Sequence, residues 1–213
     1  MPLITFDLGG VIVRLSRSLE EAATVAGVSL RPANPTHNPE LPPVFDQWQR
    51  GQISDPEFFQ RWAAGSGRFD VDDAPKLSLG WLAGEYEGVA SLIAELRASG
   101  VTTGCLSNTC AHHWAHMTTR RDLFPAIAML EHQHGSHLLG EMKPDPDIYR
   151  TYERLTGRNP QDIVFFDDLE ANIQGARDCG WNAIRVMPDR EPARQMRETL
   201  AELGLLGAGA TTP

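Results

Sequence analysis

The sequence contains a set of polar residues whose side chains are suited to holding a metal ion and an anion. They are an aspartate, a Ser-Asn pair, a lysine and two adjacent aspartates: Asp7, Ser107, Asn108, Lys143, Asp167 and Asp168. The segments "LITF", "VTTGCLS" and "DIVFF" that lead to five of them are typical of buried strands. Because ligands of open α/β sheets bind outside the carboxyl ends of the strands, we expect these side chains to meet at one edge. Lys143, in "GEMKPDP", precedes a predicted helix and is expected to reach the same edge.

Three carboxylates and an ammonium are costly to bury, because an isolated buried charge costs several kcal/mol unless it is paired or bound to a metal. Mg²⁺ binds one or two carboxylates, water and substrate phosphate oxygens, so Asp7 and Asp168 are its predicted ligands. Gly9 and Gly10 follow Asp7 without side chains, and we expect backbone N–H groups and the Gly9 carbonyl to approach the ligand closely. Helix capping explains Asp7 or Ser107 singly, but it does not explain the convergence of the whole set.

Helices and strands alternate from residue 88 onward. A helix with Val89, Leu92, Ile93 and Leu96 on one face is followed by a strand at 101–107. Further strands are predicted at 126–130 ("AIAML"), 162–167 and 182–186, and further helices at 145–157, with Ile148, Tyr152 and Leu155 on one face, at 170–180 and at 191–203. Alternation of this kind implies parallel strands joined by right-handed crossovers. We therefore predict the α/β class, with a three-layer, doubly wound parallel sheet.

Residues 15–87 have a different pattern. Helices are predicted at 16–27, 44–51 and 54–65, two of them with capping boxes at Ser18/Glu21 and Ser54/Glu57, and residues 31–43 are predicted to be an irregular connection. No strand is predicted in this region. The expected organisation is a core of residues 1–14 and 88–204, a small helical cap inserted at 15–87, and a flexible tail at 205–213.

The composition of the chain limits the kinds of molecule that it is expected to bind. The chain has 213 residues, a net charge of -9 and no run of Lys or Arg, which disfavours nucleic acid as a partner. It has no apolar run near the ~18 residues of a membrane span, and its three cysteines lack C-x-x-C spacing. We expect a cytoplasmic protein with reduced cysteines and a small phosphorylated molecule as its substrate, whereas its oligomeric state is not predicted.

Four motifs in order resemble those of the haloacid dehalogenase superfamily: "FDLGGV", "LSNT", "KPDPDIY" and "VFFDDLEAN". The resemblance is closest to the branch that contains α-D-glucose-1-phosphate phosphatase and the N-terminal phosphatase domain of soluble epoxide hydrolase, and "QRGQISDPEFF" resembles the helical cap of that branch. It implies a Rossmann-like core fold. It also implies a nucleophilic Asp7 and phosphate binding by Ser107, Asn108, Lys143 and the backbone of Gly9 and Gly10. The implied Mg²⁺ site consists of Asp7, the Gly9 carbonyl, Asp168 and Asp167, and Asn172 supports this end of the site.

The sequence departs from the family pattern at Gly9. Most phosphatases of the superfamily have an aspartate there, which protonates the leaving group, and general acid–base catalysis contributes ~10²–10⁴-fold to a rate. The resemblance therefore implies a Mg²⁺-dependent phosphatase for a sugar phosphate or another substrate with a similarly good leaving group. Two alternatives remain open: a metal-independent dehalogenase, which has no use for the Asp167/Asp168 pair, and a weakly active or inactive phosphate-binding module that serves a protein partner.

Two other groups of residues have weaker functional interpretations. His132, His134 and His137 alternate as on one face of a hairpin and could bind zinc, but a solvated turn is favoured. His112, His113 and His116 follow Ser107 and are expected to overlook the site. The aromatic residues of the insertion are expected to pack the cap, with Trp48 or Trp62 as candidates for stacking on a sugar ring.

Overall fold

The fold is built on a five-stranded parallel sheet. The computed structural model describes residues 2–32 and 41–206. The strands follow the spatial order β5-β4-β1-β6-β7, and their bounds are β1 Leu3–Phe6, β4 Thr102–Ser107, β5 His132–Gly135, β6 Ile163–Asp167 and β7 Asn182–Arg185. All neighbouring pairs are parallel, with Phe6 opposite Cys105 on one side and Phe166 on the other. This register brings the carboxyl ends of β1, β4 and β6 to one edge of the sheet.

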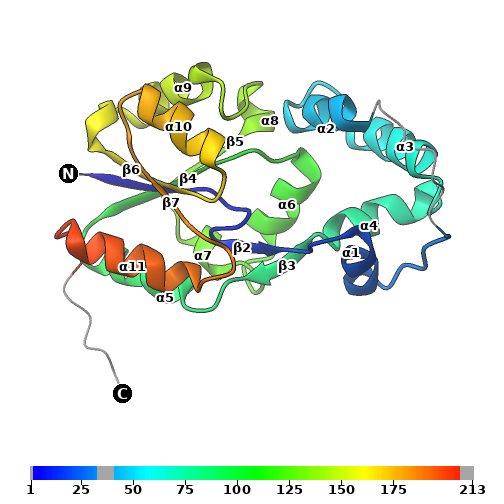
Figure 1. The fold of residues 1–213 in the computed structure, drawn as a ribbon, viewed down its shortest axis with the longest axis horizontal. Helices are drawn as coiled ribbons and strands as arrows, with labels where there is room; N and C mark the ends of the chain where they lie inside the picture. The colour runs from blue at the N-terminus through cyan, green and yellow to red at the C-terminus, as the bar shows by residue number, and fades with distance from the viewer. Residues whose placement is uncertain (1, 33–40, 207–213) are drawn as a thin grey trace.

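Helices cover both faces of the sheet, which confirms the predicted three-layer α/β architecture (Figure 1). One face packs against α5, α6, α7 and α11, which span Val89–Ala98, Ala111–Thr119, Pro125–Ala128 and Pro192–Glu202. The other packs against α9 and α10, which span Pro146–Thr156 and Glu170–Asp178, while the short α8, Ser136–Leu139, follows β5. The predicted stripe of α5 is completely buried. On α9, however, Leu155 is 47% exposed, and Tyr149 packs beside Ile148 and Tyr152 instead.

The prediction of a strand at residues 126–130 is wrong. Residues 125–128 form helix α7, in which Pro125 occupies the first turn and the Glu85 carboxylate accepts hydrogen bonds from the N–H groups of Ala126 and Ile127 at 2.9–3.3 Å. The strand of this part of the chain is β5, at residues 132–135. β5 is an edge strand, so backbone pairing with β4 sets its conformation more than an apolar pattern does.

The inserted segment forms its own layer of helices beside the sheet edge (Figure 1). Its helices are α1 Leu19–Ala26, α2 Leu41–Gln49, α3 Asp55–Ser66 and α4 Ala74–Leu79, and a single turn of 3-10 helix lies at Val71–Asp73. Ser18 and Ser54 cap α1 and α3 as predicted, by accepting hydrogen bonds from Glu21 and Glu57. The predicted irregular connection at 31–43 ends earlier than expected, because Pro42 and Pro43 lie in α2; residues 33–40 lie outside the described part.

The prediction of no strand within 15–87 is also wrong. Leu82–Glu85 forms β3, which pairs antiparallel with β2, Val13–Leu15, and this ribbon leads from the core to the cap. "LAGE" is short and carries a glycine, so it lacks the apolar alternation that indicates a strand. The aromatic core of the cap forms one cluster around Trp48, Phe58 and Trp62, separate from the two clusters of the sheet. The domain bounds remain a prediction. Of the predicted tail at 205–213, Leu205 and Leu206 pack against the core, and residues 207–213 lie outside the described part.

Candidate active site

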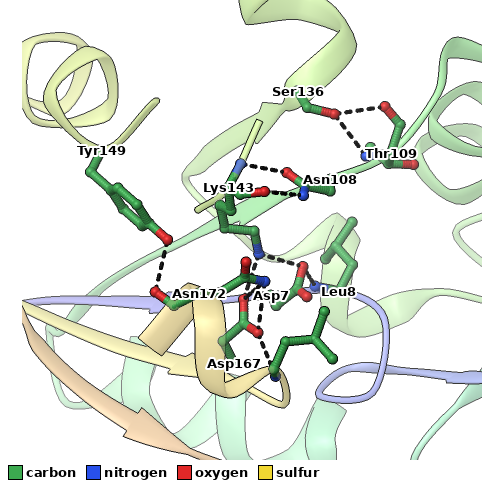
Figure 2. Close-up of polar contacts among 10 residues, drawn as sticks. Asp7, Leu8, Asn108, Thr109, Ser136, Lys143, Tyr149, Asp167 and Asn172 are labelled. Carbon is green, nitrogen blue, oxygen red and sulfur yellow. Dashed lines mark hydrogen bonds and ion pairs between the residues drawn. The ribbon is translucent and has the colours of Figure 1, made fainter. Parts of the chain in front are cut away.

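Asp7, Lys143 and Asp167 meet at the carboxyl edge of the sheet, as predicted (Figure 2). Asp7 follows β1, and its backbone N–H donates to the carbonyl of Phe166 at the end of β6. Asp167 is the last residue of β6, and Asp168 follows it. One carboxylate oxygen from each of the three aspartates lies within 4.8 Å of the other two. Among the described residues, this is the one group of three or more such side chains that could hold a metal ion.

Lys143 joins two of these carboxylates. Its Nζ lies 2.6 Å from Asp167 Oδ2 and 3.1 Å from Asp7 Oδ1, and its side chain is fully buried. Burial alone would lower the pKa of Lys143, but the carboxylates of Asp7 and Asp167 outweigh it and raise the pKa above its usual value. The ammonium therefore stays charged and offsets part of the negative charge that surrounds it.

Both carboxylate oxygens of Asp167 accept hydrogen bonds from groups of the protein. Its two oxygens accept hydrogen bonds from Lys143 Nζ, from the Leu169 N–H at 2.8 Å, and from Asn172 Nδ2 at 3.1 Å to each oxygen. A carboxylate accepts about four hydrogen bonds, so Asp167 has little capacity left for a direct metal bond. This arrangement favours a supporting role for Asp167 and Asn172, and it disfavours the predicted direct bond from Asp167 to the metal.

Asp7 is the most strongly perturbed acid of the site. It is 7% exposed, and its pKa is raised to about 7. Burial is the largest cause, Asp167 and Asp168 act in the same direction, and Lys143 and a hydrogen bond from Ser107 oppose them. The Leu8 N–H donates to Asp7 Oδ1 at 2.7 Å and fixes the orientation of the carboxylate. A buried acid with a perturbed pKa, oriented by a backbone donor and a lysine, is typical of a functional group.

The donor set fits Mg²⁺. Burial raises the pKa of Asp168 and Asp167 raises it further, and these effects outweigh the opposing ones of Lys143 and Arg185, so the negative charge at this edge is costly without a further cation. A hard divalent cation bound by oxygen atoms removes that repulsion. Asp7, Asp168 and the Gly9 carbonyl remain the predicted ligands.

Gly10 makes the approach of Asp168 possible. A Cβ on Gly10 would lie 2.5 Å from Asp168 Oδ2, and its φ of +74° is one that residues with side chains rarely adopt. The predicted need for a small residue beside Asp7 thus has a definite structural cause at this position.

Gly10→Ala should therefore be more harmful than an equivalent change elsewhere. Gly100 is a matched control, since its φ is also +74° but a Cβ added there would meet no atom within 4 Å. We expect Gly100→Ala to cost about 1 kcal/mol of unfolding free energy from backbone strain. Gly10→Ala should cost roughly 1–3 kcal/mol more and weaken Mg²⁺ binding, as measured by urea denaturation and titration calorimetry. Equal losses would show that Asp168 is not held against Gly10.

Asn108 has a structural task that the sequence did not reveal. Its Oδ1 accepts from the Lys143 N–H at 2.9 Å, and its Nδ2 donates to the Lys143 carbonyl at 2.8 Å (Figure 2). The side chain thus fixes the loop that carries Lys143. The predicted phosphate contact of Asn108 would then use its backbone N–H.

Ser136 is a supporting residue that sequence reasoning missed. Its hydroxyl accepts from the Thr109 N–H at 2.9 Å and lies 2.6 Å from the Gln49 carbonyl of the cap. It therefore ties the loop after β4 to both β5 and the cap. No spacing motif distinguishes this serine, because its partners Thr109 and Gln49 lie in two distant segments of the chain.

The histidines occupy two different places. His132 and His134 lie on the edge strand β5 rather than in the predicted solvated turn, and they form no three-residue metal group with other described side chains. His112 and His113 lie on α6 and contact the cap, through the carbonyl of Pro75 and through Ser78. The expectation that this second cluster faces the site region is confirmed for His113, which lines a pocket that Ser107 also lines.

His113 makes stability dependent on pH. Burial lowers its pKa to about 4, with a smaller contribution from His112. Between this value and the unfolded value of about 6.5 the unfolded chain binds more protons, so stability falls as pH falls through that window. From about pH 7.5 to about pH 5 we expect the wild type to lose roughly 2 kcal/mol more unfolding free energy than His113→Gln, measured by urea denaturation. Parallel losses would exclude His113 as the titrating group.

Comparison with known proteins gives a consistent result. A family profile with the description "haloacid dehalogenase-like hydrolase" matches residues 1–180. The chain is 31% identical to rat bifunctional epoxide hydrolase 2 over 110 residues, which is 49% of this chain but 19% of that protein. It is 22% identical to phosphatase MT3486 of Mycobacterium tuberculosis over 97% of both chains.

A solved structure shares the fold along nearly the whole chain. It is a HAD family enzyme from Bacteroides thetaiotaomicron in complex with magnesium and inorganic phosphate, with a TM-score of 0.75 and 22% identity, covering 92% of this chain and 100% of that one. No helix in the described part of this chain is long and apolar enough to cross a membrane.

Proposed function

This chain belongs to the haloacid dehalogenase-like hydrolases, and on that basis we propose that it is a Mg²⁺-dependent phosphatase in which Asp7 forms a covalent aspartyl phosphate. The observation that carries the proposal is the buried Asp7 carboxylate, oriented by the Leu8 N–H and paired with Lys143, with Asp168 within reach of a shared cation. Two relatives support it: one is named a phosphatase, and the other was solved with magnesium and phosphate.

The residues of the site would divide the reaction into two displacements at phosphorus. Asp7 attacks the phosphoryl group and the leaving oxygen departs; water then attacks the same phosphorus and releases Asp7 and inorganic phosphate. Ser107 Oγ, the Asn108 N–H and the Lys143 ammonium would bind the phosphoryl oxygens as charge develops on them. Mg²⁺, held by Asp7, Asp168 and the Gly9 carbonyl, would neutralise charge on the phosphoryl group. Asp167 and Asn172 would keep Lys143 and the loop after β6 in position.

Gly9 limits the substrates. The site has no carboxylic acid at position 9 to protonate the leaving oxygen, so a leaving group that is itself acidic is favoured. The anomeric hydroxyl of a sugar phosphate, or a similarly good leaving group, satisfies this condition. Phosphate esters of simple alcohols should be turned over slowly.

A phosphate-release assay tests the proposal. The purified chain would be assayed with and without Mg²⁺ on an activated aryl phosphate and a panel of sugar and nucleoside phosphates. The proposal predicts turnover that requires Mg²⁺ and is abolished by EDTA. Absence of turnover on every substrate would contradict it, and halide release from a 2-haloacid without metal would then support the dehalogenase alternative. Phosphate binding without either activity would support the interaction-module alternative.

A further inference from the structure

A pocket of about 290 Å³ lies between the cap and the core, directly beside the phosphate end of the site. Ser107 and Gly9 of the core line it, and the rest of its wall is mainly aromatic and aliphatic, with Phe45, Trp48, Trp62 and Trp81 from the cap. Of the described residues in its wall, none has a carboxylate, ammonium or guanidinium group. A substrate phosphate bound by Ser107 would therefore direct its leaving group into an uncharged, apolar space.

The aromatic wall is held rigidly. Trp48 stacks on Phe58 with ring centroids 3.6 Å apart and an interplanar angle of 5°, and the Phe45 ring meets Phe58 edge-on at 4.9 Å. The indole N–H of Trp48 donates to Asp55 Oδ1 at 2.7 Å. Because this polar atom already has a partner outside the pocket, Trp48 offers the pocket apolar surface. Rings fixed in this way offer flat surfaces that suit edge-to-face or stacked contact with another ring.

The wall is mainly apolar, and some of its polar side chains are already paired within the protein; its other polar groups include Gln49, Thr109 and the indole N–H groups of Trp62 and Trp81. Ser78 Oγ and His113 Nε2 are hydrogen-bonded to each other at 2.8 Å, and the Asn108 carboxamide is bonded to the backbone of Lys143. A hexose would bring several hydroxyl groups into this space. Each hydroxyl buried without a partner weakens binding by on the order of tenfold, so the wall discriminates against a polyhydroxylated leaving group.

The surroundings of Gly9 favour a leaving group that departs readily without being protonated. A Cβ on Gly9 would lie 3.0 Å from Leu15 Cδ1, so the side of the site where a residue-9 side chain would project faces an aliphatic group. A leaving group must therefore depart as an anion without an acid at that position. Phenols ionise with a pKa of about 10, compared with ~15.7 for water, so a phenolate departs much more readily than an alkoxide.

From these two independent observations we infer that the substrate is an aryl phosphate, the phosphate monoester of an uncharged one- or two-ring phenol. The inference rests on the proposed phosphatase function and narrows its substrate class. Asp7 attacks phosphorus, the P–O bond to the ring oxygen breaks with its electron pair on that oxygen, and the phenolate takes a proton from water. The hydroxide so formed is equivalent to the one consumed when the aspartyl phosphate is hydrolysed, so the reaction balances as ester plus water giving phenol plus phosphate.

A substrate panel with Mg²⁺ tests the inference. It comprises phenyl phosphate, 2-naphthyl phosphate, glucose 1-phosphate, 2-phenylethyl phosphate and acetyl phosphate. We expect kcat/KM for the two aryl phosphates to exceed that for glucose 1-phosphate by about 10²-fold, the effect of two unpaired hydroxyls. The 2-phenylethyl ester carries a ring but leaves as an alkoxide, so its KM should be close to that of phenyl phosphate while its kcat is much lower.

Acetyl phosphate separates the aryl preference from the phosphatase function, because its leaving group is good and too small to need the pocket. Turnover of acetyl phosphate with glucose 1-phosphate equal to or better than the aryl esters would overturn the inference and leave the phosphatase function standing. No turnover of any member of the panel would overturn both.

Two variants show whether the pocket, and not only the acidity of the phenol, sets the preference. Phe45→Leu replaces an aromatic ring of the wall with a smaller aliphatic side chain. Phe69→Leu is the matched control, because Phe69 packs on Trp62 at 4.7 Å between ring centroids but does not line the pocket. We expect Phe45→Leu to lower the ratio of kcat/KM for 2-naphthyl phosphate over glucose 1-phosphate about fivefold, and Phe69→Leu to leave it unchanged. An unchanged ratio in Phe45→Leu would contradict recognition by the aromatic wall.

Discussion

Asp7→Asn is expected to abolish phosphate release, with a fall in kcat of about 10⁴-fold or more, because it removes the atom that attacks phosphorus. The amide has nearly the shape of the carboxylate, so the loss should not come from unfolding. Phosphate release from an activated aryl phosphate in the presence of Mg²⁺ provides the measurement.

The same variant carries its own control. Because burial and the neighbouring acids raise the pKa of Asp7, its charge is costly when no metal is bound, and its neutral replacement relieves part of that cost. Without Mg²⁺ we expect the melting temperature of Asp7→Asn to equal or exceed that of the wild type. Residual activity within about tenfold of the wild type would exclude Asp7 as the nucleophile, and a large drop in melting temperature would assign it a structural role instead.

Lys143→Met is expected to be the most destabilising single change at the site. The ammonium lies between Asp7 and Asp167 with no exposed side-chain surface, and its removal leaves buried carboxylates without a counter-charge. Breaking a buried ion pair by removing one partner typically costs about 3–5 kcal/mol. Urea denaturation without Mg²⁺ should show a loss of that order, and activity should fall because the phosphoryl oxygens lose a positive partner.

A double variant distinguishes the two roles of Lys143. In Lys143→Met/Asp167→Asn the orphaned charge on Asp167 is removed as well, so most of the lost stability should return, whereas activity should not. If the double variant is as unstable as the single one, the lysine acts through packing and not through charge. If activity also returns, Lys143 does not act on the substrate.

The convergence of the site was predictable because it follows from topology. Strands that alternate with helices pair in parallel, and the carboxyl ends of parallel strands share one edge, so Asp7, Ser107 and Asp167 had to lie near one another. The helix caps at Ser18 and Ser54 were likewise predictable, since capping depends on residues three apart.

The features that could not be predicted from the sequence depend on contacts between segments that are distant in the chain. A short apolar run such as residues 126–130 fits either a strand or a buried helix, and the Glu85 carboxylate, 41 residues earlier, caps the helix that forms. The side-chain direction of Asn108 depends on the backbone of Lys143, 35 residues away. The aromatic pocket similarly requires the cap and the core to be placed against each other, which periodicity within the cap does not specify.

The central claim is that the Asp7 carboxylate carries the phosphoryl group during turnover. It is tested most directly by quenching the enzyme in acid during steady-state hydrolysis of an aryl phosphate, reducing it with borohydride, and mapping the peptides by mass spectrometry. An aspartyl phosphate is reduced to homoserine under these conditions, so we expect homoserine at position 7 that requires both substrate and Mg²⁺. Phosphate release without homoserine at position 7, or with homoserine at another aspartate, would contradict the claim.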